Sequence, residues 1–215
     1  MMRKSVVNAL AAALVLGSVG AAKASLVITW PTITAPPTGF ATTEASTPFP
    51  TNLLGYEGGY LTAVDAGSYV FTYLGLGDPS FVNTFSVSNC GSGSTFTGHT
   101  TAIGTSFTCN FAANTQIPFT FTANTTGTPQ TVKNGQTYSS GLGFLASMTN
   151  SNATTASTAG TSVYLGLSDG ASTGDKDFQD LVVQVTEVPE PASFAVLGVG
   201  LLGLGIAWSR RRSRA

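Results

Sequence analysis

The densest group of side chains able to do chemistry lies in one short stretch, residues 169–180. Four aspartates occur there among glycine, serine and threonine: Asp169, Asp175, Asp177 and Asp180. Carboxylates this close together repel one another unless water, hydrogen bonds or a cation relieves the repulsion. Hard oxygen ligands on a glycine-containing loop suit Ca²⁺. One interpretation of the stretch is therefore a calcium site formed by these four carboxylates.

A second interpretation of the same stretch needs no metal. Aspartates in turns accept hydrogen bonds from nearby backbone N–H groups, and Lys176 places a positive charge inside the stretch. The spacing also departs from an EF-hand, because Asp180 stands where that loop requires glycine and no glutamate closes it. The residues themselves leave calcium binding and turn capping open.

Few other residues offer catalytic chemistry. His99 is the only histidine, and a lone histidine between glycine and threonine is typically just solvated. No His-Glu-x-x-His metal motif occurs. Glu44 or Glu57 could meet an aspartate as in glycosidases, but no spacing recommends this. We therefore expect a protein that is not an enzyme.

The elements that position these residues are expected to be β-strands. Helix-favouring surface residues are scarce, while β-branched and aromatic residues recur in short runs punctuated by Gly, Pro and Asn. Apolar and hydroxyl side chains alternate in places, which is typical of strands with one buried face. We expect a jelly-roll-like antiparallel β-sandwich of two packed sheets, with an irregular arm at 31–50 and a flexible loop at 150–160. The expected strands are Val27–Trp30, Gly67–Leu74, Ser80–Val87, Thr105–Phe111, Ile117–Ala123, Ser162–Leu167 and Leu181–Thr186.

The chain begins with the three parts of a signal peptide. Two basic residues give a positive start, and a mostly apolar stretch follows at residues 6–19. Ala22 and Ala24 then place small side chains at the positions that signal peptidase reads, so cleavage is expected before Ser25. The apolar stretch is shorter than the roughly 20 residues that a membrane span needs. Residues 1–24 are therefore expected to form a signal helix that is removed during export.

A second apolar segment lies near the other end of the chain. Residues 192–208 are uncharged, and at about 1.5 Å per residue a helix there reaches roughly 25 Å, enough for one transmembrane span. A basic tail follows at 209–215, with arginines at Arg210, Arg211, Arg212 and Arg214. The positive-inside rule keeps such a tail in the cytoplasm. Together with a cleaved signal peptide, this places residues 25–187 outside the membrane as one domain.

Directly before the expected helix stand Pro189, Glu190 and Pro191, which favour an extended peptide. Pro-Glu-Pro, a short glycine-rich apolar helix and a terminal arginine cluster, in this order over residues 188–215, resemble the PEP-CTERM sorting signal of diderm bacteria. The resemblance implies recognition of the tripeptide by exosortase during export. It also implies a protein anchored by its helix before processing and then directed to the cell surface or extracellular matrix.

Cys90 and Cys109 are the only cysteines, separated by a segment rich in Gly, Ser and Thr. After export they meet an oxidising compartment, which favours a disulfide between them. The rival interpretation is a metal or catalytic thiol, but only His99 lies nearby as a further ligand. We expect the structural disulfide.

Charge and a second resemblance bear on partners. Between residues 25 and 187, two basic residues face nine acidic ones, a net charge of −7, so we expect no nucleic-acid partner.

Residues 174–183 resemble the Gly-Asp-x-Asp-Phe-Asn/Gln-Asp motif that closes extracellular β-sandwich domains common among PEP-CTERM proteins. We expect a non-catalytic structural protein of the surface, exopolysaccharide matrix or biofilm. The alternative is a calcium-dependent carbohydrate-binding module, with Trp30, Tyr56, Tyr60 and Tyr138 as its loop aromatics.

Overall fold

Every secondary-structure element that the computed structural model describes is a β-strand, which confirms the all-β prediction. The structure describes residues 25–29, 38–39, 53–77, 81–124, 128–136, 142–152, 154–170 and 178–189. The expected signal helix and transmembrane helix lie outside these residues. The strands are β1 (Leu26–Thr29), β2 (Thr38–Gly39), β3 (Leu54–Glu57), β4 (Tyr60–Ala63), β5 (Gly67–Gly75), β6 (Asn83–Val87), β7 (Thr95–Thr97), β8 (Ser106–Phe111), β9 (Thr115–Gln116), β10 (Phe119–Ala123), β11 (Gln130–Lys133), β12 (Gly143–Met148), β13 (Ala159–Gly160), β14 (Ser162–Ser168) and β15 (Leu181–Glu187).

The largest sheet contains seven antiparallel strands in the order β2-β3-β12-β14-β15-β5-β8. β5, β8, β14 and β15 coincide with expected strands to within a residue at each end. In β5 the aromatic side chains of Tyr69, Phe71 and Tyr73 all point into the core, each no more than 1% exposed. The alternation of aromatic and smaller residues in the sequence therefore predicted correctly which face of this strand is buried.

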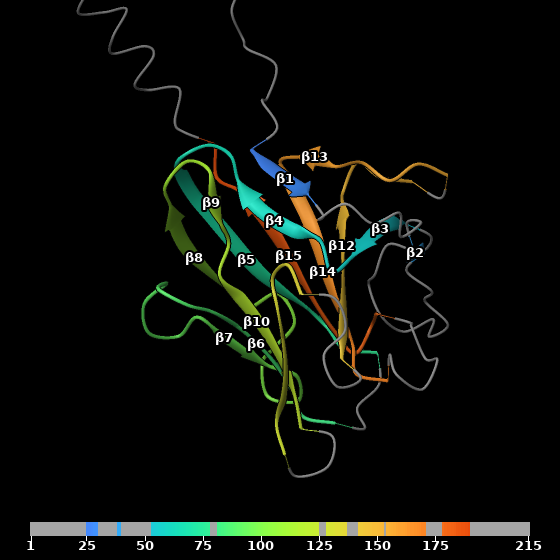
Figure 1. Ribbon diagram of the computed structural model, residues 1–215. Coiled ribbons are helices and arrows are strands. Elements are labelled where there is room, and N and C mark those ends of the chain that lie inside the picture. Colours follow the sequence, from blue (N-terminus) through green and yellow to red (C-terminus); the bar gives the residue numbers. More distant parts are fainter. Residues whose placement is uncertain are drawn as a thin grey trace, which may run out of the picture.

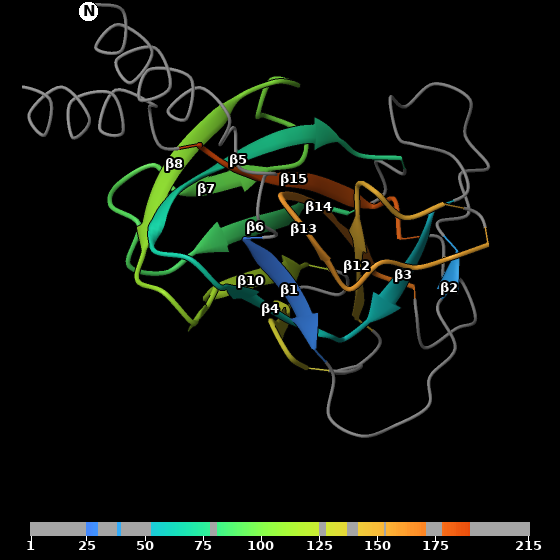
Figure 2. The same cartoon turned by 90° about the horizontal axis from the view of Figure 1, so that it is seen from above.

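The second layer is divided into two sheets, so the expectation of two packed sheets is wrong in number. One four-stranded sheet has the order β13-β1-β4-β9 and the other the order β11-β10-β6-β7. Both lie over the seven-stranded sheet, with β1 and β4 at one end and β6 and β10 at the other (Figures 1 and 2). The sandwich thus has two layers but three sheets.

The division falls at Pro118, which lies within the expected strand Ile117–Ala123 but just before the observed start of β10. β9 and β10 follow one another along the chain, separated only by Ile117 and Pro118. Proline has no backbone N–H, so the hydrogen-bond ladder cannot continue through it. Ile117 donates its N–H to Leu61 of β4, whereas Phe119 already pairs with Val87 of β6.

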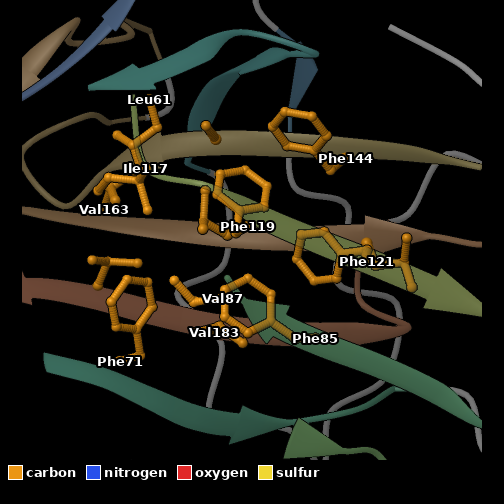
Figure 3. Packing of buried hydrophobic residues seen from close by; sticks show 14 of the residues in the cluster. Leu61, Phe71, Phe85, Val87, Ile117, Phe119, Phe121, Phe144, Val163 and Val183 are labelled. Carbon is orange, nitrogen blue, oxygen red and sulfur yellow. The ribbon is translucent and has the colours of Figure 1, made fainter. Parts of the chain in front are cut away.

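The hydrophobic core lies between the two layers and is rich in aromatic rings. Phe85 of β6 occupies its middle, with ring centroids 5.0 Å from Phe121, 5.8 Å from Phe119 and 5.9 Å from Phe71. The Phe85 ring meets Phe121 edge-on, at an interplanar angle of 63°, and is stacked at 26° with Phe119, and aromatic pairs prefer edge-on or offset-stacked arrangements (Figure 3). Burial of such large apolar surfaces is the main force holding the layers together.

Two further expectations about local structure need correction. Residues 150–160 are not simply a flexible loop, because β13 lies within them and Thr158 accepts a 2.8 Å hydrogen bond from Ile28 of β1. The Asn152 side chain also accepts backbone N–H bonds from Thr154 and Thr155, at 2.9 and 2.8 Å. The expected strand at residues 80–87 begins only at Asn83. Of the expected arm at 31–50, the structure describes only β2.

Candidate functional site

Two of the four predicted aspartates meet at one end of the sandwich, around the side chain of Asn83. Asp169 follows β14, Asp180 precedes β15, and Asn83 begins β6 in the facing layer. The Asn83 amide donates to Asp169 Oδ2 at 2.8 Å and to the Asp180 carbonyl at 3.2 Å. The backbone N–H of Asp169 donates to Asp180 Oδ2 at 2.6 Å. One amide and two acidic residues therefore join the two layers of the fold.

The chain around Asp180 is held in an unusual conformation. Phe178 has a positive φ of 52° yet is fully buried, in contact with Leu145 of β12. The next carbonyl, of Gln179, accepts the N–H of Gly77 at 2.7 Å. A Cβ at Gly77 would lie 2.7 Å from the Gln179 side chain, so glycine is needed for this approach. Phe178 thus acts as an anchor that places Asp180 against the end of β14.

The polar network around Asn83 is deeply buried. Asn83 is 1% exposed and Asp180 is 4% exposed. Both N–H groups of Asn83 Nδ2 donate hydrogen bonds, whereas Asn83 Oδ1 accepts none within the described part of the chain. A buried carbonyl oxygen of this kind is an available ligand for a cation or acceptor for a water molecule. Asn83 was absent from the predicted site, because it lies 86 residues before Asp169 in the sequence.

The calcium prediction stays a prediction. Asp175 and Asp177 lie outside the described residues, and within those residues no three acidic, histidine or cysteine side chains are grouped closely enough to hold a metal ion. The hydrogen bonds of Asp169 and Asp180 agree with the turn-capping interpretation for these two residues.

The predicted disulfide is present between Cys90 and Cys109, whose Cα atoms lie 5.1 Å apart. Cys109 is in β8, the edge strand of the seven-stranded sheet, and is 2% exposed. Cys90 lies in the connection between β6 and β7 of the other layer. The bond therefore joins the two layers along one edge and serves a structural purpose.

Other residues considered for chemistry occupy ordinary positions. The His99 ring nitrogen Nε2 lies 2.9 Å from the carbonyl of Phe81, at an exposed site. The Tyr56 hydroxyl donates to the carbonyl of Ala156 at 3.0 Å, and the Tyr60 ring lies against Gly135. Glu44, Trp30 and Tyr138 are outside the described residues. A shallow hollow of about 270 Å³ is lined by Ser88, Gln116, Ile117, Pro118, Phe119, Thr120, Lys133 and Asn134.

The described domain begins and ends beside one short piece of β5. Ser25 is fully buried, and its carbonyl accepts the Tyr69 hydroxyl at 3.3 Å. At the other end, the Val188 N–H donates to the carbonyl of Ser68 at 2.8 Å. Pro189, the first residue of the predicted sorting tripeptide, follows directly and is exposed. Within the described ranges no helix is long and apolar enough to cross a membrane, and residues 190–215 fall outside them.

These features define a β-sheet domain with a sorting segment attached directly to its last strand. A family model described as the PEP-CTERM protein-sorting motif matches residues 187–212. No curated protein and no solved structure matches the chain. The chain carries a PEP-CTERM sorting signal, as predicted, and is an exported substrate of exosortase with a cell-surface destination.

Proposed function

We propose that this protein is a non-catalytic structural component of the bacterial surface or extracellular matrix, where it associates with exopolysaccharide. The sorting signal, with its cell-surface destination, supports this proposal. The proposal further includes removal of residues 1–24 by signal peptidase. The observation that carries it is the outer face of the β11-β10-β6-β7 sheet, which is covered by hydroxyl groups.

The hydroxyl face follows from the alternation of side chains across the four strands. Phe85 and Phe121 point into the core, so their neighbours in β6 and β10 point outward. Cross-strand partners on this outer face are again hydroxyl residues, and none of the set is fully buried. The set consists of Thr84, Ser86, Thr95, Thr97, Thr120, Thr122 and Thr131.

Such a face suits a hydroxyl-rich polymer. Neighbouring strands lie about 4.8 Å apart and alternate residues about 7 Å apart along a strand, so the hydroxyls form a regular array. Each hydroxyl can donate one hydrogen bond and accept two, as sugar hydroxyls do. The only charged member of this face is Lys133, opposite Thr120. Many weak, repeated contacts favour retention in a matrix over tight binding of one small ligand.

The experiment removes hydroxyls without removing the fold. Thr84→Val and Thr122→Val, combined, keep a β-branched side chain while deleting two paired hydroxyls. We expect less of this variant than of the natural protein to sediment with the exopolysaccharide of the producing cell. The matched control is Thr72→Val with Thr108→Val, on strands β5 and β8 of the opposite layer. Equal sedimentation of all three proteins would contradict the matrix role of this face.

A calcium-dependent carbohydrate-binding module is the second candidate, supported by the buried cluster of Asn83, Asp169 and Asp180. In this case Ca²⁺ would be held by Asp169, Asp175, Asp177 and Asp180 together with the Asn83 carbonyl oxygen. Calorimetry of the exported protein with millimolar Ca²⁺ should then give heat and raise the melting temperature, and Asp180→Asn should abolish both. Glycan-array binding that disappears with a calcium chelator would favour this candidate over the matrix role.

A further inference from the structure

Ser25, the first residue of the domain after the expected cleavage point, is firmly fixed by hydrogen bonds. Its carbonyl accepts the Val64 N–H at 2.7 Å and the Tyr69 hydroxyl at 3.3 Å. The residue is fully buried, and β1 begins immediately after it. The backbone nitrogen of Ser25 therefore has a defined position within the fold.

Asp65 lies on one side of this nitrogen. β1 and β4 are antiparallel with Leu26 opposite Ala63, so the same register places Ser25 opposite Val64, and Asp65 follows Val64 in the chain. Directly opposite residues in an antiparallel pair have Cα atoms about 4.5–5.5 Å apart. The Tyr69 hydroxyl also donates to the Asp65 carbonyl at 2.8 Å, so this one hydroxyl contacts both Asp65 and Ser25.

Glu187 lies on the other side. β1 and β13 are antiparallel with Leu26 opposite Gly160, which places Ser25 opposite Thr161. The Thr161 carbonyl accepts the Glu187 N–H at 3.0 Å. Glu187 is also the cross-strand partner of Tyr69, so its side chain lies on the same sheet face as the ring that reaches Ser25.

The field at this end of the domain is negative. The pKa of the Tyr69 hydroxyl is raised first by burial and then by the negative charge of Glu187, with a further contribution from Asp65. Asp65 and Glu187 form no ion pair with a described side chain, and Lys133 is the only lysine or arginine among the described residues. A positive charge at the Ser25 nitrogen would therefore complement its surroundings.

We propose that Asp65 and Glu187 form a binding site for the α-ammonium group that signal-peptide cleavage creates at Ser25. The inference rests on the proposed export route, because cleavage before Ser25 supplies the ammonium group. In the precursor this nitrogen is a neutral amide, whereas in the mature chain it carries three N–H donors and a charge. A charge held near buried groups is stabilising only when it is paired, and the charges of Asp65 and Glu187 both act on the Tyr69 hydroxyl that contacts Ser25. Removal of the signal peptide thus completes the folded domain.

The test compares two exported chains that differ only at their first residues. The natural chain and a variant with Gly-Gly inserted between Ala24 and Ser25 are each exported in a diderm host that lacks exosortase, then purified in detergent. Intact mass identifies the first residue of each product. The insertion moves the ammonium away from the site, so we expect its melting temperature to be about 2–4 °C lower at pH 7.

Carboxylate variants separate the ion pair from simple crowding. In an Asp65→Asn, Glu187→Gln background, we expect the insertion to have no further effect. Glu57→Gln, on β3, is the matched control and should leave the effect of the insertion intact. An insertion without effect in the natural chain, or with the same effect in the double variant, overturns the proposal. A mass showing no cleavage before Ser25 instead contradicts the export route, so the two failures are distinguishable.

The pH dependence gives a second measurement that does not depend on the variants folding equally well. The site favours the charged amine, so the α-amino pKa should be raised above its ordinary value of about 7.7–8.0. The difference between the natural and extended chains is then present at pH 7 and lost as pH rises through the folded-state pKa. NMR titration of the Ser25 nitrogen in the natural chain measures this directly. An ordinary or lowered pKa overturns the proposal.

Discussion

Replacement of Asn134 by alanine is expected to weaken the fold far more than its position in a turn suggests. Asn134 is 8% exposed and follows β11. Its Oδ1 accepts the Leu61 N–H at 2.8 Å, and its Nδ2 donates to the carbonyls of Leu61 and Ile117 at 2.8 and 2.7 Å. The amide pairs with Leu61 as a strand residue would, at the place where Pro118 interrupts the ladder.

The expected loss of stability depends on which hydrogen-bonding groups keep a partner after the substitution. The Leu61 carbonyl still accepts the Ile117 N–H, and the Ile117 carbonyl still accepts the Phe119 N–H. Loss of those two bonds from Nδ2 costs about 0.5–1 kcal/mol each. The Leu61 N–H would be left unpaired in a buried strand, at about 1–3 kcal/mol. The sum is about 3 kcal/mol, or a fall in melting temperature of about 6–12 °C for a domain of this size.

Urea unfolding followed by circular dichroism, with the disulfide intact, measures this change. The control is Asn150→Ala, because Asn150 is exposed and its amide makes a single 3.1 Å bond to the Ala159 carbonyl. That variant should stay within about 0.5 kcal/mol of the natural protein. Asn134→Asp keeps the acceptor but faces two carbonyls with a carboxylate, so it should be at least as damaging as alanine. A loss below about 1 kcal/mol for Asn134→Ala would refute the argument that the amide substitutes for the interrupted ladder.

Three further perturbations test other parts of the structure. Gly135 has a φ of +80° and a Cβ there would overlap the Tyr60 ring, so Gly135→Ala should lower the unfolding free energy by at least about 2 kcal/mol in urea titrations. Reduction of the Cys90–Cys109 disulfide, which closes a loop with a sequence separation of 19, should lower it by about 3 kcal/mol; an unchanged urea midpoint would count against a structural bond. Burial raises the pKa of Tyr73, so the neutral hydroxyl is favoured in the folded state and stability should fall only as pH rises above about 10. A tyrosinate absorbance that titrates fully near pH 10 while circular dichroism stays native would contradict that.

Strands with one buried face were predictable, whereas of the strands buried on both faces β14 was found and β12 was missed. β5 was found because its aromatic residues alternate with smaller ones, and only one set is fully buried. β12 was missed although it is central in the seven-stranded sheet, because all six of its residues are buried. A continuous apolar run does not distinguish a strand from a helix by its period. The two-residue strands β9 and β13 carry no pattern at all and exist only through their partners.

The candidate site shows a similar limit. Asp169 and Asp180 were found because they lie close together in sequence beside a strand. Asn83 lies 86 residues before Asp169, and only the packing of β6 over the larger sheet brings the two together. Asn134 and Leu61 are likewise separated by 73 residues. Hydrogen bonds between layers depend on register and on interruptions such as Pro118, which local residue patterns do not encode.

The positions of the two chain ends give the sorting signal a structural context. Adjacent residues of β5 hold both ends: the Tyr69 hydroxyl reaches the Ser25 carbonyl, and the Ser68 carbonyl accepts the Val188 N–H. The start of β1 and the end of β15 accordingly lie at the same end of the sandwich (Figure 1). This arrangement agrees with the proposed export route, in which a signal peptide and a C-terminal helix would approach one bilayer from the same side. The last backbone hydrogen bond is made by Val188, immediately before Pro189, so little chain separates the folded domain from the tripeptide. We therefore expect exosortase to act close to the domain, at the end where Ser25 is anchored.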